Sequence, residues 1–563
     1  MPASNGLAQA QALRMRGPAL TDPPGDVEGM NVNKTPRILD ANCGLGHVPG
    51  KSGSARTAGD LLRIMDRLGI AAALVHSTEA VRGNWPYGNA RLMREIRGRG
   101  RLIPCWVVAP DVLAGPRPAE LVATMAAAGV RAVRLCPRSQ RHSLTPLVCG
   151  PLLDCLAAAR LPVILDFEIY GWNETPDWAA VAELASRWPT LSFILPGCVL
   201  AASRNMVPHL QRYPNLYLDI GAYQEVGGIA AFIRAFGGHR AVWGSAFPHR
   251  GHEIALGLLQ GRQLGPRARA AIGAANLAAL MEGRVPRPIP AEPPAVARKL
   301  PLAAIDVHMH LGCDLAGTAE FTADQAVAAL DAWGMQCGVA SHLAALSGDV
   351  AEGNDALLDA CRRHPGRLYG WAFFDAAQPE RSAASCRRLL RHRAIVGFKV
   401  HQGTDERKLD DPGYEAMFQM ANALSLPILA HENSHDGFET TLQKIARRWP
   451  RVRILHAHHG GTTDAPAAQQ MARRLQRFPN LWLETSTSFA PPDAVGHLVR
   501  AGGGQRLCYG TDLGFMDNDG QTGKVLFADL TRKQLADVLR NNALKLIPRL
   551  SGQAPRHRRA PHH

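Results

Sequence analysis

Five side chains that can bind a metal ion recur along the C-terminal half of the chain, each in or just after a short apolar run. They are His308, His310, His431, His458 and Asp512. Imidazoles combined with a carboxylate form a site suited to Zn²⁺, with Fe²⁺, Mn²⁺ and Co²⁺ as alternatives. If one coordination position is left for water, the ion lowers the pKa of that water towards neutrality. We therefore expect one divalent transition metal in this half of the protein.

The spacing of the first two histidines strengthens this prediction. His308 and His310 lie two residues apart in a run typical of a strand, so their side chains point to the same side. A lone pair of this kind is more often structural than metal-binding. Here the pair stands between Asp306 and Gly312, and the other three candidates follow in order along the chain. The combination favours a metal site.

The chain contains the same framework twice, which indicates a tandem duplication. AIDVHMHLG at 304–312 matches ILDANCGLG at 38–46, an offset of 266, and Asn542 still matches Asn276 at that offset. The candidate ligands are missing from the first copy, although its apolar framework persists. Their counterparts there are Asn42, Gly44, Asp166, Gly197 and Ala246. We expect only the second copy to bind metal.

The elements that must position these residues alternate between strand and helix. Each copy has eight short apolar runs with amphipathic stretches between them, which predicts an α/β fold of two tandem TIM (β/α)₈ barrels. The candidates fall at the C-terminal ends of their strands, where such barrels carry chemistry. The predicted organisation is a disordered extension over 1–34, barrels over 35–284 and 301–550, a Pro-rich linker over 285–300 and a basic tail over 551–563.

Composition narrows the function classes. The net charge of +15 is spread singly over helical stretches rather than in a basic run, so we expect no nucleic-acid partner. The 11 cysteines form no CxxC pair, which fits a reducing compartment. No segment is typical of a signal peptide or a membrane span, so we expect no membrane partner and a cytoplasmic location.

The segments DVHMHLG, GFKVHQ, LPILAHE, RILHAHHGG and YGTDLG resemble the amidohydrolase superfamily, in its amidohydrolase-related branch. That branch includes metal-dependent hydrolases and decarboxylases similar to aminocarboxymuconate-semialdehyde decarboxylase. The motifs are intact over 301–548, whereas 36–284 keeps only the framework. The resemblance implies that the metal ligands are His308, His310, His431 and Asp512. It implies that His458 acts as an acid/base or polarising residue.

Two further residues lie on the predicted fourth strand. In some binuclear members of the superfamily, a carbamylated lysine on this strand bridges two metals. For Lys399 we instead favour contact with substrate or with the residues around the metal, and His401 faces the same way. Glu484 ends the predicted seventh strand, and because Asp219 matches it in the first copy, we expect that carboxylate to be architectural.

Three functions remain open at this point. The leading hypothesis is a hydrolase that acts on a small amide, ester or lactone through a metal-activated water. The second is a non-oxidative decarboxylase that uses the same site. The third is a non-catalytic scaffold of two barrels that binds ligand without turnover. In the first two, the degenerate barrel takes the place of a partner subunit, which gives an intramolecular pseudo-dimer.

Overall fold

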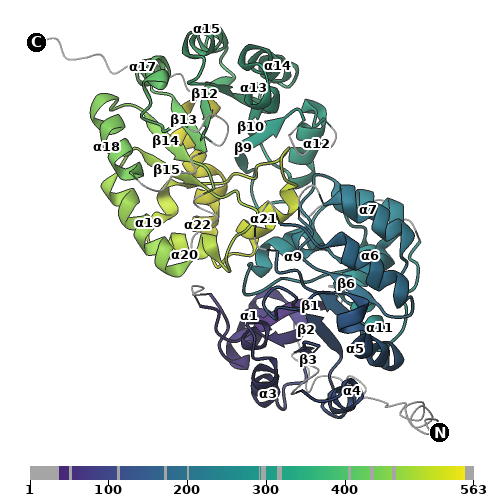
Figure 1. Ribbon diagram of the computed structural model, residues 1–563. Coiled ribbons are helices and arrows are strands. Elements are labelled where there is room, and N and C mark those ends of the chain that lie inside the picture. Colours follow the sequence, from purple (N-terminus) through teal and green to yellow (C-terminus); the bar gives the residue numbers. More distant parts are fainter. Residues whose placement is uncertain are drawn as a thin grey trace, which may run out of the picture.

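Each half of the chain folds into a parallel eight-stranded barrel in the computed structural model (Figure 1). The structure describes residues 37–49, 53–110, 115–169, 171, 174–199, 202–290, 292, 299–313, 320–402, 407–431, 437–458 and 464–551. The predictions for 1–34 and, apart from Ser551, for 551–563 therefore fall outside the described residues. The described part of 285–300 contains neither helix nor strand.

The first barrel is built in chain order, and each strand pairs with the next. Its strands are β1 (Ile38–Leu45), β2 (Ile70–Ser77), β3 (Leu102–Val107), β4 (Ala132–Leu135), β5 (Val163–Leu165), β6 (Phe193–Leu195), β7 (Leu216–Asp219) and β8 (Ala241–Val242). Its helices are α1 (Ala58–Leu68), α2 (Thr78–Val81), α3 (Trp85–Glu95), α4 (Pro118–Ala127), α5 (Pro146–Ala159), α6 (Trp178–Arg187), α7 (Ser203–Arg212), α8 (Gly228–Phe236), α9 (His252–Gln260), α10 (Pro266–Ala270) and α11 (Asn276–Met281).

The second barrel repeats this order. Its strands are β9 (Ile305–Leu311), β10 (Cys337–His342), β11 (Leu368–Phe373), β12 (Ile395–His401), β13 (Pro427–His431), β14 (Arg453–His456), β15 (Leu481–Glu484) and β16 (Leu507–Cys508). Its helices are α12 (Ala323–Trp333), α13 (Leu343–Ser347), α14 (Val350–Arg363), α15 (Pro379–Leu389), α17 (Glu415–Leu424), α18 (Phe438–Arg448), α19 (Ala465–Arg477), α20 (Ala494–Arg500), α21 (Asn518–Leu526), α22 (Arg532–Ala536) and α23 (Asn542–Leu546). The prediction of two tandem (β/α)₈ barrels is confirmed.

Each barrel is closed by backbone hydrogen bonds between its first strand and the segment after its eighth. The N–H of Gly44 donates to the carbonyl of Phe247 at 2.6 Å, and the N–H of His310 donates to that of Leu513 at 2.6 Å. A buried aspartate supports each closure, because Asp40 and Asp306 accept backbone N–H groups from both of the segments that meet.

The two copies also share their irregular features. Each has a five-residue π-helix before its last helix, at Ala271–Ala275 and at Asp537–Asn541. The equivalent residues Ala246 and Asp512 both adopt a left-handed backbone, with φ of 56° and 61°. Non-glycine residues rarely adopt this conformation. The structural equivalence of the copies therefore extends to details that hydrophobic periodicity does not encode.

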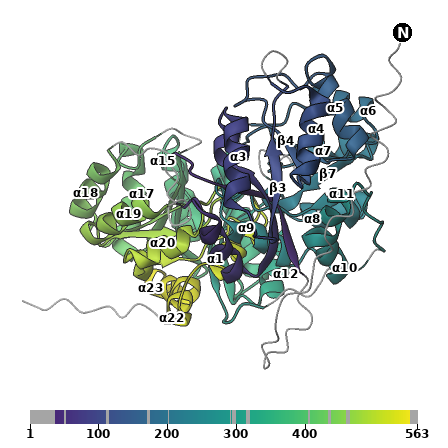
Figure 2. The same ribbon diagram turned by 90° about the horizontal axis from the view of Figure 1, so that it is seen from below.

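The barrels contact each other through equivalent helices, α9 and α21, which lie side by side in Figure 1. Figure 2 shows α9 between the two barrels. Gly257 of α9 and Gly523 of α21 are 266 positions apart, so they occupy the same place in the two copies. A Cβ on Gly257 would lie 2.8 Å from the Cα of Gly523, and a Cβ on Gly523 would lie 2.4 Å from the Cα of Gly257. This position meets its own counterpart, as on the axis of a two-fold dimer.

Loops after the seventh strands extend the contact in the same reciprocal way. The amide nitrogen of Gln224 donates to the carbonyl of Ser488 at 3.1 Å, and its amide oxygen accepts from Gln521 at 2.8 Å. The second barrel makes the equivalent contact, because the carbonyl of Ala490 accepts the N–H of Gly251 at 2.9 Å as that of Gln224 accepts the N–H of Asp517 at 2.8 Å. The ring of Phe489 also lies 4.7 Å from the guanidinium of Arg250. Each barrel therefore places a loop against the segment that follows the eighth strand of the other.

Lys524 is buried at this joint, and no carboxylate of the described residues forms an ion pair with it. The Nζ of Lys524 donates to the amide oxygen of Gln521 at 2.7 Å and to the carbonyl of Thr487 at 3.4 Å. Burial lowers the pKa of Lys524 from 10.5 to about 7. The equivalent position in the first copy is Leu258, so the two-fold pattern is broken here.

Substituting either axial glycine should destabilise the joint. In Gly257→Ala or Gly523→Ala, the new methyl group would overlap backbone atoms of the other barrel, which typically costs about 1–3 kcal/mol. Both variants should lower the midpoint of thermal unfolding by similar amounts. Gly59→Ala in α1 is the matched control, because its Cβ would make only ordinary contacts with Thr57 and Arg63, at 3.7 and 3.8 Å, and alanine favours a helix. Unchanged midpoints in both axial variants would contradict the close contact.

Lys524 should give the protein a distinctive pH dependence. Its folded-state pKa of about 7 lies below the ordinary 10.5, so between these values the unfolded chain binds one more proton than the folded chain. Stability from this group therefore rises as pH increases from about 7 to about 10. Lys524→Leu, which installs the residue of the first copy, should remove this rise in thermal midpoint. Lys533→Leu, which replaces an exposed lysine, should leave it in place.

Candidate metal centre

The predicted site residues all lie at the C-terminal mouth of the second barrel. The first strand, β9, supplies His308 and His310, and β12 supplies Lys399 and His401. His431 ends β13, whereas His458 and Asp512 follow β14 and β16. The N–H of Asp512 donates to the carbonyl of His308 at 2.7 Å, so the closure of the barrel also brings these two together.

Three of the predicted ligands form one compact group. His308, His310 and Asp512 each offer a ligand atom, and these atoms all lie within 4.8 Å of one another. The Oδ1 atom of Asp512 is 2.8 Å from Nε2 of His310 and 3.4 Å from Nε2 of His308. All three side chains are buried. The convergence predicted from the strand ends is therefore present for these residues.

The other ring nitrogens of the two histidines have their own partners. Nδ1 of His308 lies 3.1 Å from a carboxylate oxygen of Glu484, and Nδ1 of His310 lies 3.0 Å from the hydroxyl of Ser341. Such contacts orient a histidine so that its second nitrogen faces the metal. Glu484 also accepts the backbone N–H groups of His458 and Ser486 at 2.6 Å, which agrees with the expected architectural role.

His431 and His458 lie beside this group and contact each other. The Nε2 of His458 is 3.2 Å from Nδ1 of His431, and its Nδ1 is 3.1 Å from the carbonyl of Ser486. The ring of His431 also lies 4.1 Å from that of His401. The structure does not bring His431 into the compact group of three, so its role as a ligand stays a prediction.

Lys399 lies among the metal-binding candidates. Its Nζ is 3.1 Å from Nε2 of His308, the nitrogen that faces Asp512. Burial lowers the pKa of Lys399 to about 8. Burial, followed by the charge of Lys399, lowers the pKa of His401 to about 3. Both side chains therefore face the mouth, as the alternation along the fourth strand predicts.

The electrostatics keep the imidazoles neutral and the aspartate ionised. Burial lowers the pKa of His308 to about 4 and also lowers that of His310. Burial raises the pKa of Asp512, but the interactions with His308 and His310 outweigh it and hold the pKa well below its ordinary value. Neutral imidazoles and a carboxylate are the protonation states that a metal ion requires.

The equivalent mouth of the first barrel is filled by a different network. The guanidinium of Arg134, in the position of Lys399, pairs with Asp166 and donates to the amide oxygen of Asn42 at 2.6 Å. The amide nitrogen of Asn42 donates to Asp219 at 3.2 Å. A Cβ on Gly44 would already lie 2.9 Å from Pro248, which leaves no room for an imidazole. A buried arginine thus links residues of the first, fourth and fifth strands.

Sequence reasoning missed some of these residues. Ser341 contacts His310 and Ser486 contacts His308, both candidate ligands, but nothing distinguishes these serines from others in the sequence. The ion pair of Arg134 with Asp166 could have been suspected from the sequence. The two residues carry opposite charges and occupy the positions of Lys399 and His431, at the ends of neighbouring strands.

None of the described helices has the length and apolarity that a membrane span needs.

Solved structures with a similar fold come from several organisms. One is a Staphylococcus aureus protein provisionally assigned as an amidohydrolase (15% identity, 44% of this chain and 100% of that chain, TM-score 0.35). A second is 2,6-dihydroxybenzoate decarboxylase from Rhizobium (16% identity, 43% and 98%, TM-score 0.35). A third is a manganese-bound dihydroxybenzoic acid decarboxylase from Polaromonas (15% identity, 45% and 98%, TM-score 0.36). Likeness at this level carries no argument about the reaction.

Sequence comparison gives the family directly. No curated protein sequence is significantly similar to this chain. The family model described as amidohydrolase matches twice, over residues 62–282 and 305–549. These two matches fall on the two barrels and together span most of the chain. The protein therefore belongs to the amidohydrolase family and carries one domain of that family in each barrel.

Proposed function

We propose that the second barrel is a metal-dependent hydrolase that acts on a small amide, ester or lactone. The observation that carries the proposal is the compact group of His308, His310 and Asp512 at the C-terminal mouth of the barrel. Its donor set of two neutral imidazoles and a carboxylate favours Zn²⁺ and also suits Fe²⁺, Mn²⁺ or Co²⁺. When bound, such an ion supplies Lewis acidity, which polarises a carbonyl and acidifies water.

His431 completes this donor set in the proposal. The carbonyl of Ser486 can only accept, so the Nδ1 of His458 that faces it carries a proton. In the neutral ring, Nε2 of His458 is then an acceptor, and the facing Nδ1 of His431 must donate to it. That tautomer leaves a lone pair on Nε2 of His431. This is the form in which an imidazole binds a metal ion.

The chain's own residues then divide the work of hydrolysis. Asp512, which is ionised, accepts a proton from the attacking water and returns it to the leaving group. His458 acts once substrate is bound: its Nε2 exchanges the contact with His431 for the carbonyl oxygen of the substrate and, when protonated, stabilises the negative charge that develops there. Lys399, which lies 3.1 Å from His308, donates from the floor of the site to a substrate oxygen.

One observation favours a second candidate, a non-oxidative decarboxylase. The buried amine of Lys399 stands at the metal-binding group, where it could pair with the carboxylate of a substrate before CO₂ is lost. The ion and the three residues of the compact group would serve both reactions. Segments 314–319, 403–406, 432–436 and 459–463, which follow strands at this mouth, lie outside the described residues.

We also propose that the first barrel is a non-catalytic partner fixed in place by the fusion. Two observations support this role: the contact of Gly257 with Gly523, and the Arg134 network in place of a metal centre. A small-molecule substrate and a cytoplasmic location complete the proposal. The ten cysteines other than Cys313 are free thiols, which fits a reducing compartment.

Metal analysis and turnover should separate the roles of the site residues. His308→Ala/His310→Ala should lose one equivalent of metal relative to the wild type, whereas the exposed-site control His47→Ala should lose none. Asp512→Asn should nearly abolish turnover, because an amide is a poor ligand and a poor base. His458→Asn should keep its metal and lower kcat by about 10²–10⁴. Complete metal loss in His458→Asn would instead make His458 a ligand.

A substrate panel should decide between the reactions. We expect turnover of members of a panel of amides, esters and lactones, and no CO₂ release from carboxylated aromatic or enoic acids. Lys399→Met should then raise KM more than it lowers kcat, with metal content unchanged. Release of CO₂ without hydrolysis would establish the decarboxylase. A metal-loaded protein that turns over neither panel would support the non-catalytic scaffold.

A further inference from the structure

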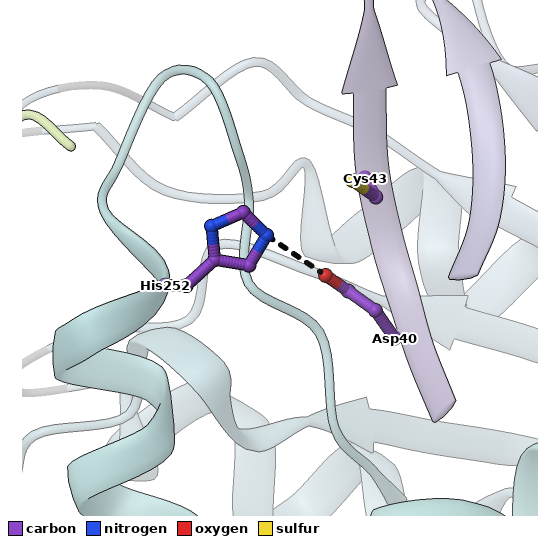
Figure 3. Close-up of side chains that lie close together, drawn as sticks. All are labelled: Asp40, Cys43 and His252. Carbon is purple, nitrogen blue, oxygen red and sulfur yellow. Dashed lines mark ion pairs between the residues drawn. The ribbon is translucent and has the colours of Figure 1, made fainter. Parts of the chain in front are cut away.

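Asp40, Cys43 and His252 gather between the first strand of the first barrel and α9. Asp40 and Cys43 belong to β1, and His252 is the first residue of α9. In Figure 3, the side chains of His252 and Asp40 point toward each other, and Cys43 lies farther along the same strand. Their ligand atoms all lie within 4.8 Å of one another, and all three residues are buried. This cluster has no part in the candidate metal centre.

Two polar atoms in this cluster are left without hydrogen bonds. One oxygen of Asp40, Oδ1, accepts the backbone N–H groups of Asn42 and Ser245, each at 2.9 Å. The other, Oδ2, and the Nε2 of His252 have no hydrogen-bond partner among the described residues. Such atoms are rare in a protein interior, because each costs about 1–3 kcal/mol in lost hydration.

The distance between these two atoms suits a shared cation. Oδ2 of Asp40 and Nε2 of His252 are 3.6 Å apart, which is too long for a hydrogen bond. Two ligands that each lie about 2.1 Å from a tetrahedral ion stand about 3.4 Å from each other. The sulfur of Cys43 would have to move by about 1 Å at most to become the third ligand of such an ion.

The second copy lacks this arrangement. The counterparts of the three residues are Asp306, Met309 and Asn518, and the second oxygen of Asp306 accepts the hydroxyl of Thr511. Ser245 stands in the place of Thr511, and its hydroxyl donates to the carbonyl of Asn42 instead. The cysteine and the histidine therefore occur together in the copy where the aspartate oxygen is left open.

We propose that Asp40, Cys43 and His252 bind a structural Zn²⁺ ion, one more ion than the sequence predicts for the chain. A thiolate, a carboxylate and a neutral imidazole carry two negative charges in total, which a divalent ion neutralises. A neutral cluster is the form that can be buried at low cost. The fourth position falls to the hydroxyl of Ser245 or to a water molecule.

The ion would fix α9 to the barrel wall. This helix carries Gly257 and packs against α21, so a bond between its first residue and β1 would hold the docking surface of the first barrel in place.

Cobalt can report this site separately, because the compact group of the second barrel contains no sulfur. The full chain loaded with Co²⁺ should bind two ions and show a thiolate-to-cobalt charge-transfer band. Cys43→Ser/His252→Asn should lose the band and one ion, with a lower thermal midpoint than the wild type. His308→Ala/His310→Ala should lose the other ion and keep the band. Cys105→Ala, a buried cysteine of the same barrel, should change neither.

The two proposed metal sites can therefore be tested independently of each other. A wild-type chain without the thiolate band, whose metal content is the same in Cys43→Ser/His252→Asn, would overturn the zinc site and leave the second barrel unaffected. A wild-type chain that binds two ions without the thiolate band, and loses one of them in Cys43→Ser/His252→Asn, would show that the thiol is no ligand and would overturn the three-ligand site. If the double variant does not fold, His252→Asn alone gives the same readouts, because asparagine occupies position 518 of the second copy.

Discussion

The closure of each barrel depends on one buried carboxylate. Asp306 accepts the backbone N–H of His308 from the first strand and that of Thr511 from the segment after the eighth, at 3.1 Å each. Because the same segments carry the metal-binding candidates, the contact that closes the sheet also sets the distance between His308 and Asp512. Asp40 makes the equivalent contacts in the first barrel. The fold can therefore persist when the chemistry is lost, since closure does not use the ligand side chains.

In the first barrel, a different hydrogen-bond network occupies the positions of the candidate metal ligands. Without partners at the positions of the candidate ligands, Asp219 and Arg134 would be buried charged groups with no hydrogen bonds, and burying such groups is costly in free energy. The guanidinium of Arg134 satisfies Asp166 and Asn42 together, and Asn42 in turn satisfies Asp219. An arginine suits this task because its planar group donates in several directions and stays charged. The degenerate mouth is thus internally paired rather than empty.

The sequence predicts the barrels and most of the site because both depend on periodic patterns. Apolar runs locate the strands, and parallel strand ends must converge, so His308, His310 and Asp512 could be grouped in advance. Side-chain direction at a strand end is not periodic, and the position of His431 outside the compact group could not be predicted. Contacts between distant strands, such as Glu484 with His308, depend on three-dimensional packing. The reciprocal contact of α9 with α21 was equally inaccessible, because the expectation of a pseudo-dimer named no surface.

Because the two copies are fused in one chain, the two sides of their interface can carry different residues, which is impossible in a homodimer. In a symmetric dimer, any residue near the axis appears on both sides, so a buried ammonium would face a second ammonium. Here Lys524 stands on one side and Leu258 on the other, and the ammonium of Lys524 donates to Gln521 and Thr487. Each half of the joint can therefore change without a matching change opposite. A surface that began as self-complementary can evolve as two different surfaces, one on each barrel.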